Sequence, residues 1–234
     1  MRRGDGKKLL MSAMVSSQTV ACFDRVSMGL LRDVSFTLEE GSSAKILFDS
    51  EDRKNLLFGL LAGLQRPETG RILFFGEDLF AHEEDERLAL YQRVGVVPAH
   101  GGLISNLKAW ENLLLPAWYH RGLTAEQAER PVAEIFDRLG PGEAGLKQRM
   151  GELPGQLSLY ERRVVALVRA MLMEPDILIY DFTFAGLDRD AAQQLMKLTG
   201  EFHGRKAGRV SLYLCPDDAV SARLAADSTI TLTH

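Results

Sequence analysis

Runs of alternating or continuous apolar residues divide the first half of the chain into short strands. Alternation with a period of two at 19–23 and 31–38 predicts antiparallel strands, and the apolar run at 44–48 predicts a central strand. Two further strands are predicted at 70–75 and 94–97. Between these strands, leucines recur at helical spacing and predict an amphipathic helix. These leucines are Leu56, Leu57, Leu60, Leu61 and Leu64.

The pattern changes from strands to helices over residues 110–156. Thr124 and Gln127 form a predicted capping box, and Pro131 predicts a kink or restart in the following helix, because proline lacks a backbone donor. The Gly-Pro-Gly sequence at 140–142 predicts a loop. Beyond this section we expect helix and strand to alternate again. The expected order is a helix at 159–172, a strand from 177, a helix at 191–202, a strand at 210–214, a helix at 218–226 and a strand at 228–233.

This order of elements predicts an α/β fold with a mixed sheet core, an antiparallel β subdomain and a lateral helical lobe. We expect one domain over residues 18–234, with a helical subdomain inserted at about 100–165. Residues 1–17 are predicted to be a flexible leader. Basic residues before a short apolar patch there also resemble a secretory signal, but serines break the patch. No apolar run approaches the roughly 18–20 residues of a membrane span, so another subunit would have to hold the chain at a membrane.

The composition narrows the classes of function only slightly. A hydrophobic content of 46% suits a globular α/β protein, and a net charge of -4 gives no reason to expect nucleic acid as a partner. Cys22 and Cys215 fit no zinc or Cys-x-x-Cys spacing, and we expect both to be buried thiols in a reducing cytoplasm. The five histidines show no ligand spacing, so we expect them at the surface and predict no metal site.

The most informative segment runs from Ile177 to Asp188 and reads ILIYDFTFAGLD. It predicts a buried strand that delivers Asp181 to the edge of a sheet, followed by a turn. This segment resembles the Walker B motif and D-loop of the ATP-binding-cassette (ABC) ATPases, in which a catalytic glutamate and a proline follow the aspartate. Phe182 and Thr183 stand at those two positions, and a phenyl ring cannot accept a proton from water. The D-loop of the resemblance comprises Ala185, Gly186, Leu187 and Asp188.

The resemblance extends through nearly the whole chain and implies the ABC ATPase-like P-loop fold. The sequence at 61–70 is similar to the helix exit that follows the phosphate loop, and counting back places that loop at 48–56. A phosphate loop needs two glycines so that its backbone amides can wrap a phosphate, but Phe48 and Arg53 stand there. Lys54 matches the motif. The other degenerate positions are Ser50, Glu51, Asp52 and Asn55.

Charge within this loop opposes phosphate binding. A carboxylate about 5 Å from a phosphate charge costs about 3 kcal/mol at an effective dielectric of roughly 20, or on the order of 100-fold in affinity. Glu51 and Asp52 supply two carboxylates, and Asn55 lacks the hydroxyl that would hold magnesium. We therefore expect no cofactor, with Mg-ATP expected only if the motifs work in divergent form. Alternatively, the acids beside Ser50 cap a helix start, or they are solvated loop residues.

The other motifs of the resemblance are altered in parallel. Ala99 stands at the Q-loop glutamine and Pro216 at the switch histidine. The signature motif corresponds to LSLYE, in which Ser158 matches but Leu159 and Tyr160 replace glycines. Losing one positioned general base typically costs about 100-fold to 10,000-fold in rate. The combined losses imply that the chain has no catalytic residues.

Simpler structural roles are open for several of these residues. Lys54 and Asp181 can persist because they pair with each other in the fold, and Ser158 can be a plain N-cap. Trp110 and Trp118 can be core residues. The resemblance also places Trp110 where family members meet their permease. The implied permease-docking residues are His100, Leu103 and Trp110.

The resemblance implies a catalytically degenerate ABC transporter subunit, a pseudo-ATPase and not a working enzyme. Its expected partners are a transmembrane permease and a second ATPase-like subunit, either a copy of itself or an active ABC ATPase, at the inner face of the cell membrane. Residues 95–116 are most similar to the lipid-transport ATPases of the mammalian-cell-entry (Mla-type) systems, which implies lipid transport. Two alternatives stay open. One is a functional ABC ATPase with divergent motifs that hydrolyses ATP, and the other is a cytosolic regulator without a membrane partner.

Overall fold

The computed structural model describes residues 19–81, 83–139 and 144–232. The predicted leader at 1–17 and the loop at 140–142 lie outside the described residues. The strands are β1 (Thr19–Met28), β2 (Leu31–Glu39), β3 (Ser43–Phe48), β4 (Thr69–Phe74), β5 (Glu77–Asp78), β6 (Val94–Val97), β7 (Ile177–Asp181), β8 (Val210–Pro216) and β9 (Ser228–Leu232). The α-helices are α2 (Glu51–Leu61), α3 (Glu84–Tyr91), α4 (Ala109–Arg121), α5 (Ala125–Leu139), α6 (Ala144–Gln148), α7 (Leu159–Leu172) and α8 (Arg189–Gly204). Short 3-10 helices are η2 (Arg149–Gly151), η3 (Pro154–Gln156) and η4 (Ser221–Arg223).

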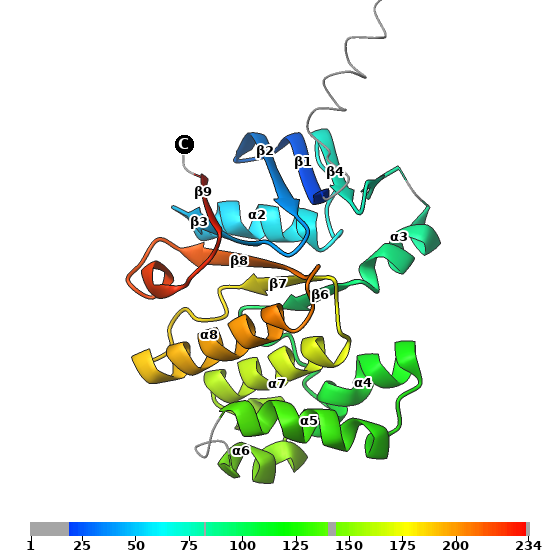
Figure 1. The fold of residues 1–234 in the computed structure, drawn as a ribbon, viewed down its shortest axis with the longest axis vertical. Coiled ribbons are helices and arrows are strands. Elements are labelled where there is room, and N and C mark those ends of the chain that lie inside the picture. The colour runs from blue at the N-terminus through cyan, green and yellow to red at the C-terminus, as the bar shows by residue number, and fades with distance from the viewer. Residues whose placement is uncertain (1–18, 82, 140–143, 233–234) are drawn as a thin grey trace, which may run out of the picture.

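Two sheets organise the molecule (Figure 1). The first is antiparallel, with the strand order β2-β1-β4-β5, and matches the predicted β subdomain. The second has the order β6-β7-β8-β3-β9 and its strand pairs are parallel. Strand β3 pairs with β8 on one side and β9 on the other, so its predicted central position is confirmed. The predicted α/β class is confirmed as well.

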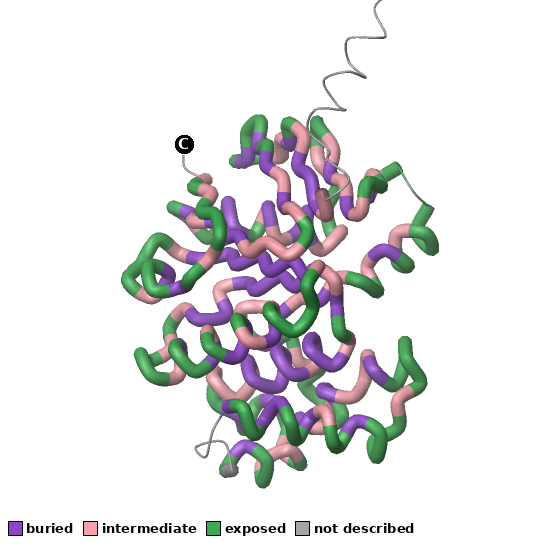
Figure 2. The backbone as a smooth tube through the Cα atoms, viewed as in Figure 1, coloured by how far each residue is buried: buried purple, intermediate pink, exposed green. Residues whose placement is uncertain are grey.

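The parallel sheet is buried on both faces, as Figure 2 shows by the buried backbone at the centre of the molecule. Successive residues of β7 belong to different hydrophobic clusters. Ile177 and Ile179 pack with α2 and the antiparallel sheet, whereas Leu178 and Tyr180 pack with α7 and α8. Strands covered by helices on both faces have nearly continuous apolar sequences, which explains why β7 was recognisable.

The helical lobe lies on the α7 side of the sheet (Figure 1). Its buried residues on α5, such as Ile135 and Phe136, share a hydrophobic cluster with those of α7. The predicted capping box is confirmed, since the backbone N–H of Thr124 donates to Gln127 Oε1 at 2.9 Å and the N–H of Gln127 donates to Thr124 Oγ1 at 3.3 Å. Helix α5 continues through Pro131 without the predicted restart.

Two expectations about the helices were wrong, and one helix was not predicted. Residues 218–226 form only the short helix η4, because the Asp218 carboxylate accepts the N–H groups of Val220 and Ser221 and the chain is extended again at Leu224. Leu64 is 75% exposed beyond the end of α2, which stops before Gly63 with its φ of 67°. Helix α3 was not predicted, because its first four residues are all charged.

Candidate functional site

The segment expected to be a phosphate loop is largely helical. Helix α2 begins at Glu51, and Ser50 is its N-cap, with Oγ accepting the backbone N–H of Arg53 at 3.4 Å. The predicted loop at 48–56 is therefore shorter than expected, because the chain winds into a helix once Ser50 satisfies a free backbone donor. Glu51 and Asp52 are exposed in the first turn, where their charge complements the helix dipole. The helix-capping interpretation is confirmed for Ser50.

Arg53 does not project toward a phosphate site. Its side chain is buried and forms an ion pair with Asp49, one turn back. Its Nε also donates to the carbonyl of Leu30 at 3.4 Å. These contacts fasten the start of α2 to the turn between β1 and β2, a role that was not predicted. Asn55 is exposed on the outer side of the helix.

Lys54 and Asp181 form the ion pair that was one of the interpretations of the sequence. Lys54 Nζ lies 2.9 Å from Asp181 Oδ1, and both side chains are only 6% exposed. The second carboxylate oxygen of Asp181 accepts the backbone N–H of Ala99 at 3.3 Å. Asp181 thus contacts both Lys54 and Ala99, the residues that the resemblance places at the P-loop lysine and the Q-loop glutamine.

Phe182 covers this ion pair. Lys54 Nζ lies 5.0 Å from the centroid of the Phe182 ring and 6.0 Å from that of Phe58, which allows cation–π attraction. The backbone of Phe182 is held at a φ of 45°, a left-handed conformation that is unfavourable for a phenylalanine, and its N–H donates to the carbonyl of Leu214 at 3.0 Å. The residue at the catalytic glutamate position is therefore fixed by the sheet and packed over the lysine.

Arg163 on α7 joins the surrounding loops. Its buried guanidinium donates through Nε to the carbonyl of Ala99 at 2.8 Å and through Nη1 to the carbonyl of Ala185 at 2.5 Å. Burial lowers the pKa of Arg163 from its usual value, and the nearby Asp181 charge opposes that shift. Arg163 was not recognised from the sequence, although an arginine on the apolar face of a helix is the signal that marks it.

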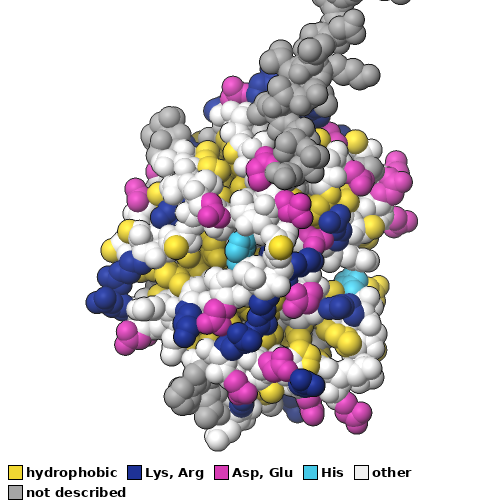
Figure 3. Space-filling model, in the orientation of Figure 1, with side chains coloured by type: hydrophobic (Ala, Val, Ile, Leu, Met, Phe, Trp, Pro, Cys, Tyr) yellow, Lys and Arg dark blue, Asp and Glu magenta, His cyan; other side chains and the backbone are white. Residues whose placement is uncertain are grey.

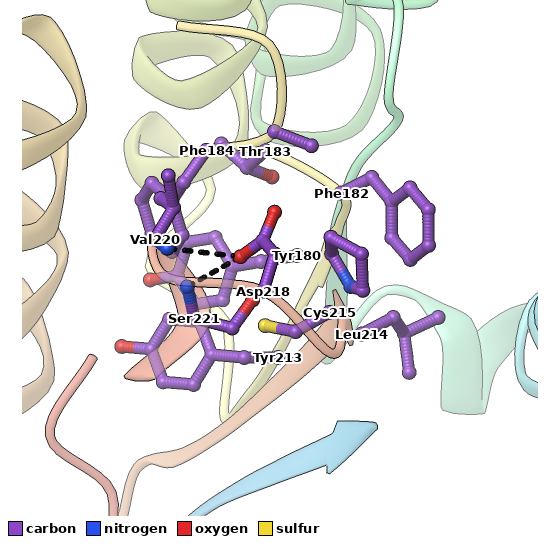
Figure 4. A pocket seen from close by; sticks show the side chains of 12 residues that line it. Tyr180, Phe182, Thr183, Phe184, Tyr213, Leu214, Cys215, Asp218, Val220 and Ser221 are labelled. Atoms are coloured by element: carbon purple, nitrogen blue, oxygen red, sulfur yellow. Dashed lines mark hydrogen bonds between the residues drawn. The ribbon is translucent and has the colours of Figure 1, made fainter. Parts of the chain in front are cut away.

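A small cavity lies beside these residues at the ends of β7 and β8 (Figure 4). Its volume is about 10 Å³, on the order of one water-sized sphere and too small for a phosphate group. The Asp218 side chain points toward Thr183, and Asp218 Oδ1 accepts the N–H groups of Val220 at 3.0 Å and Ser221 at 2.8 Å. Phe182 points away from Thr183, and Pro216, at the switch histidine position, also lines the cavity.

The signature segment forms the N-terminus of α7. Ser158 Oγ accepts the N–H of Glu161 at 3.2 Å, and the N–H of Ser158 donates to Glu161 Oε2 at 2.7 Å, so Ser158 is the predicted N-cap. Arg149 Nη1 donates to Glu161 Oε1 at 2.7 Å. Tyr160 spans to α8, where its hydroxyl donates to Gln194 Oε1 at 3.2 Å.

The D-loop residues lead into α8. Asp188 is the N-cap, with Oδ1 accepting the N–H groups of Asp190 at 3.0 Å and Ala191 at 2.9 Å. Gly186 has a φ of 70°, which glycine adopts without strain, and Leu187 packs against the hydrophobic cluster of the helical lobe. The turn itself is therefore built as a well-formed helix start.

The implied permease-docking residues differ in their exposure. His100 is exposed, whereas Leu103 and Trp110 are partly buried against the hydrophobic cluster of the helical lobe. The core interpretation of Trp118 was wrong, since its side chain is 63% exposed, beside Tyr119 at 76%. A groove of about 350 Å³ lies on the same helix, α4. It is lined by Asn112, Leu115, Pro116, Tyr119, His120 and Arg169.

The remaining histidines and cysteines have structural positions. His203 is half-buried rather than exposed, with Nδ1 3.0 Å from Ser211 Oγ and Nε2 3.1 Å from the carbonyl of Gly41. His82 and His234 lie outside the described residues. Both cysteines are free and buried, as predicted. On the face drawn in Figure 3, basic and acidic side chains are interspersed.

Comparison with known families agrees with this geometry. The family model described as ABC transporter matches residues 31–185. The chain therefore belongs to the ABC transporter family.

Individual relatives and solved structures place the chain within that family. It is 33% identical over 172 residues to the lipoprotein-releasing system ATP-binding protein LolD 1 of Rhodopirellula baltica, covering 73% of this chain and 72% of that protein. It is 31% identical to the sulfate/thiosulfate import ATP-binding protein CysA of Mesorhizobium japonicum, over 83% of this chain but only 54% of that protein. It is 30% identical to the macrolide export protein MacB of Hyphomonas neptunium, of which it spans 29%.

Two solved structures share the fold. The dimeric ATP-binding cassette MJ0796 bound to ADP and Pi superimposes with a TM-score of 0.77 at 22% identity, covering 91% of this chain and 94% of that chain. An ATP-binding subunit of an ABC transporter gives a TM-score of 0.75 at 26% identity, over 92% and 86% of the two chains. The ABC ATPase-like fold is thus confirmed.

Family membership also sets the coarse biological context. The chain is an ABC transporter subunit of the ATP-binding class, and proteins of this class act as dimers with transmembrane permeases. Within the described part of the chain, every helix is too short or too polar to cross a membrane.

Proposed function

We propose that this chain is a pseudo-ATPase subunit of an ABC transporter, which neither binds nor hydrolyses ATP. The observation that carries the proposal is the buried pair of Lys54 and Asp181, 2.9 Å apart and covered by Phe182. The lysine that would bind phosphate is neutralised within the protein. The aspartate that would serve magnesium is occupied by that lysine and by the N–H of Ala99. A nucleotide would have to break this arrangement before it could bind.

The backbone around the pair supports the same conclusion. Only Asp49 and Ser50 separate β3 from α2, so few loop amides are available to wrap a phosphate. The exposed Glu51 and Asp52 add negative charge to the first helical turn. The catalytic position is a phenyl ring, and Pro216 replaces the switch histidine. We therefore assign no catalytic residues and no cofactor to this chain.

As a subunit without turnover, the chain would act as a structural or regulatory partner of a membrane permease, of an active ABC ATPase, or of both. The exposed Trp118 and Tyr119 beside the 350 Å³ groove support a docking role, because exposed aromatic side chains are enriched at protein interfaces. We place this contact, with His100, Leu103 and Trp110 near it, at the inner face of the cell membrane. The relative named as a lipoprotein-releasing protein supports lipid or lipoprotein transport.

Isothermal titration of the purified chain with Mg-ATP tests the proposal. We expect no saturable heat up to millimolar nucleotide, because binding must break the Lys54–Asp181 pair. Micromolar affinity would overturn the assignment. A variant with Phe48→Gly, Arg53→Gly, Asn55→Ser and Phe182→Glu is expected to gain binding.

The restored variant needs its own control. Adding Lys54→Met to it should abolish the gained binding, because the lysine is the remaining phosphate ligand of the motif. If the restored variant binds no nucleotide although it is folded, the alignment of the loop is wrong.

The second candidate function is an active ATPase with divergent motifs. It is favoured by the relatives, which are named as ATP-binding proteins. In that case the complex purified from membranes would hydrolyse ATP, and Lys54→Ala or Asp181→Asn would abolish the activity. Unchanged hydrolysis in both variants would assign the activity to another subunit and exclude this candidate.

The third candidate is a regulator without a membrane partner. Purification from detergent-solubilised membranes separates it from the first, because only a transporter subunit should retain a permease. Tyr119→Glu, in the groove, is expected to lose the permease. Leu88→Glu is the matched control, since Leu88 is 55% exposed on α3 and outside the groove. If neither substitution has an effect on a retained permease, docking occurs elsewhere.

A further inference from the structure

The segment between β6 and α4 is fastened to the core by side chains from several elements. At its start, Ala99 is held from two sides. Its N–H donates to Asp181 Oδ2 at 3.3 Å, and its carbonyl accepts Arg163 Nε at 2.8 Å. Asp181 is itself fixed by the ion pair with Lys54. The buried pair therefore reaches the first residues of this connection.

The middle of the segment is held by the side chain of Arg169. Arg169 donates to the carbonyls of Gly101 and Gly102, both at 3.0 Å. Gly101 has a φ of 86°, and a Cβ there would lie 2.9 Å from the carbonyl oxygen of Arg162. The backbone of Gly101 thus lies directly against α7 with no space for a side chain.

The end of the segment is held by α4. Asn112 Oδ1 accepts the N–H of Ile104 at 2.7 Å, and Asn112 Nδ2 donates to the carbonyls of Ile104 at 3.0 Å and Leu107 at 2.9 Å. Asn112 is buried, so these bonds are shielded from water. The connection is therefore fixed at its start, its middle and its end.

Two of these fastening side chains also line the α4 groove. Arg169 and Asn112 hold the segment and at the same time form the wall next to Leu115, Pro116 and Tyr119. A shift of the segment would move both side chains and change the groove. The position of the groove is thus tied through Ala99 to the Lys54–Asp181 pair.

We propose that the Lys54–Asp181 pair is a built-in clamp that holds residues 98–104 and sets the shape of the α4 groove without nucleotide. This inference rests on the proposed function, because it assigns the groove to the permease. The clamp implies that the permease docks whether or not nucleotide is present. The Lys54–Asp181 ion pair fixes the geometry of the α4 groove, and Mg-ATP does not change that geometry.

Hydrogen exchange of the full chain tests the clamp. In Lys54→Met and in Asp181→Asn, we expect the amides of residues 99–107 and of the groove helix α4 to exchange about 10-fold faster, because the hydrogen bond from the Ala99 N–H to Asp181 is weakened when the ion pair is lost. The amides of β1 and β2 report the global loss of stability in each variant, and the clamp is measured by the additional exchange at residues 99–107 beyond that of β1 and β2. Asp24→Asn is the control, since it removes an ion pair to Arg71 of 2.8 Å in the antiparallel sheet, and it should leave residues 99–107 unaffected.

Exchange at 99–107 that rises no more than that of β1 and β2 in both folded variants would overturn the clamp. If both variants unfold, hydrogen exchange of the unmodified chain tests the inference instead. The Ala99 amide should then exchange as slowly as the amides of β7, and fast exchange at Ala99 would refute the clamp. A parallel measurement with Mg-ATP separates the two proposals. Protection of α2 by nucleotide would refute the pseudo-ATPase assignment, whereas the clamp is judged on the variants alone.

Discussion

The N-termini of α2 and α7 are built on the same plan and differ in where their charges lie. Each helix begins after a serine N-cap, Ser50 or Ser158, and each has lost the glycines that the resemblance implied. At α2, Lys54 forms a buried ion pair with Asp181, although Glu51 and Asp52 in the same helical turn are exposed. At α7 the charges of Glu161 and Arg149 are partly exposed. The ion pair at the first helix start is therefore enclosed in the protein, whereas the pair at the second stays in partial contact with water.

This difference has an energetic consequence. A buried ion pair loses most of its hydration, so removing one partner leaves an uncompensated charge in the interior. A partly exposed pair keeps water available to either partner and contributes less. The capping box of Ser158 and Glu161 depends only on local backbone geometry. The N-terminus of α7 is therefore preserved although the signature glycines are replaced. The comparison therefore predicts that removing a charged partner costs more stability at the start of α2 than at the start of α7.

The largest effect is expected for Lys54→Met. It leaves the Asp181 carboxylate buried without its cation, which costs about 3–5 kcal/mol of unfolding free energy. That corresponds to roughly 6–20 °C in Tm for a chain of this size. Adding Asp181→Asn should recover much of the loss, because the unpaired charge is then gone. Urea unfolding of the single and double variants measures the coupling.

A small loss of unfolding free energy in Lys54→Met would contradict this comparison. If Lys54→Met lowers the unfolding free energy by less than about 1 kcal/mol, the pair behaves like a surface ion pair. The closure of the α2 site would then depend on the packing of Phe182 alone. Phe182→Leu in the same background separates the ring contact from the charge.

The fold was predictable where periodicity reports burial directly. The apolar run of β7 and the helix Leu159–Leu172 follow from patterns that only packed elements produce, and α7 has the predicted bounds. Helix α3 was missed because its first four residues are all charged and only Leu90 is buried, so it gives no such pattern. The helix expected at 218–226 failed because the Asp218 side chain satisfies two backbone donors and ends the turn early.

The residues that form the site could largely be predicted from the sequence, but the contacts that those residues make could not. The resemblance to the ABC ATPase motifs placed Lys54 and Asp181 in one site, and their pairing was one of the interpretations of the sequence. The contacts of Arg53 and Arg163 were not anticipated, because a position on an apolar helix face indicates that an arginine is buried but not which backbone carbonyls it binds. Their carbonyl partners are brought to them only by the tertiary fold, from positions 22 to 179 residues away along the chain.

A middle-sized effect is expected for Ser158→Ala, which sharpens the comparison between the two caps. Ser158 takes part in a reciprocal box with Glu161, whereas the Ser50 hydroxyl makes a single cap contact of 3.4 Å. We expect Ser158→Ala to cost about 1 kcal/mol, or roughly 2–4 °C in Tm, and Ser50→Ala to cost less. Thermal unfolding of both variants under one condition gives the ranking, and a larger loss for Ser50→Ala would reverse it.

The smallest effect concerns pH at the α7 end. Burial raises the pKa of Glu161, but the Ser158 hydrogen bonds and Arg149 outweigh it, so the net pKa is lowered. A carboxyl with a lowered folded pKa stabilises the protein above its unfolded pKa of about 4.3, and this contribution is lost as pH falls through the folded value. Glu161→Gln should therefore flatten the fall in stability below about pH 4.5, relative to the unmodified chain.

Urea midpoints measured between neutral and acidic pH test this, with Glu126→Gln, exposed on α5, as the control. Parallel acid limbs in the Glu161→Gln variant and the unmodified chain would show that the Arg149 contact is too solvated to matter.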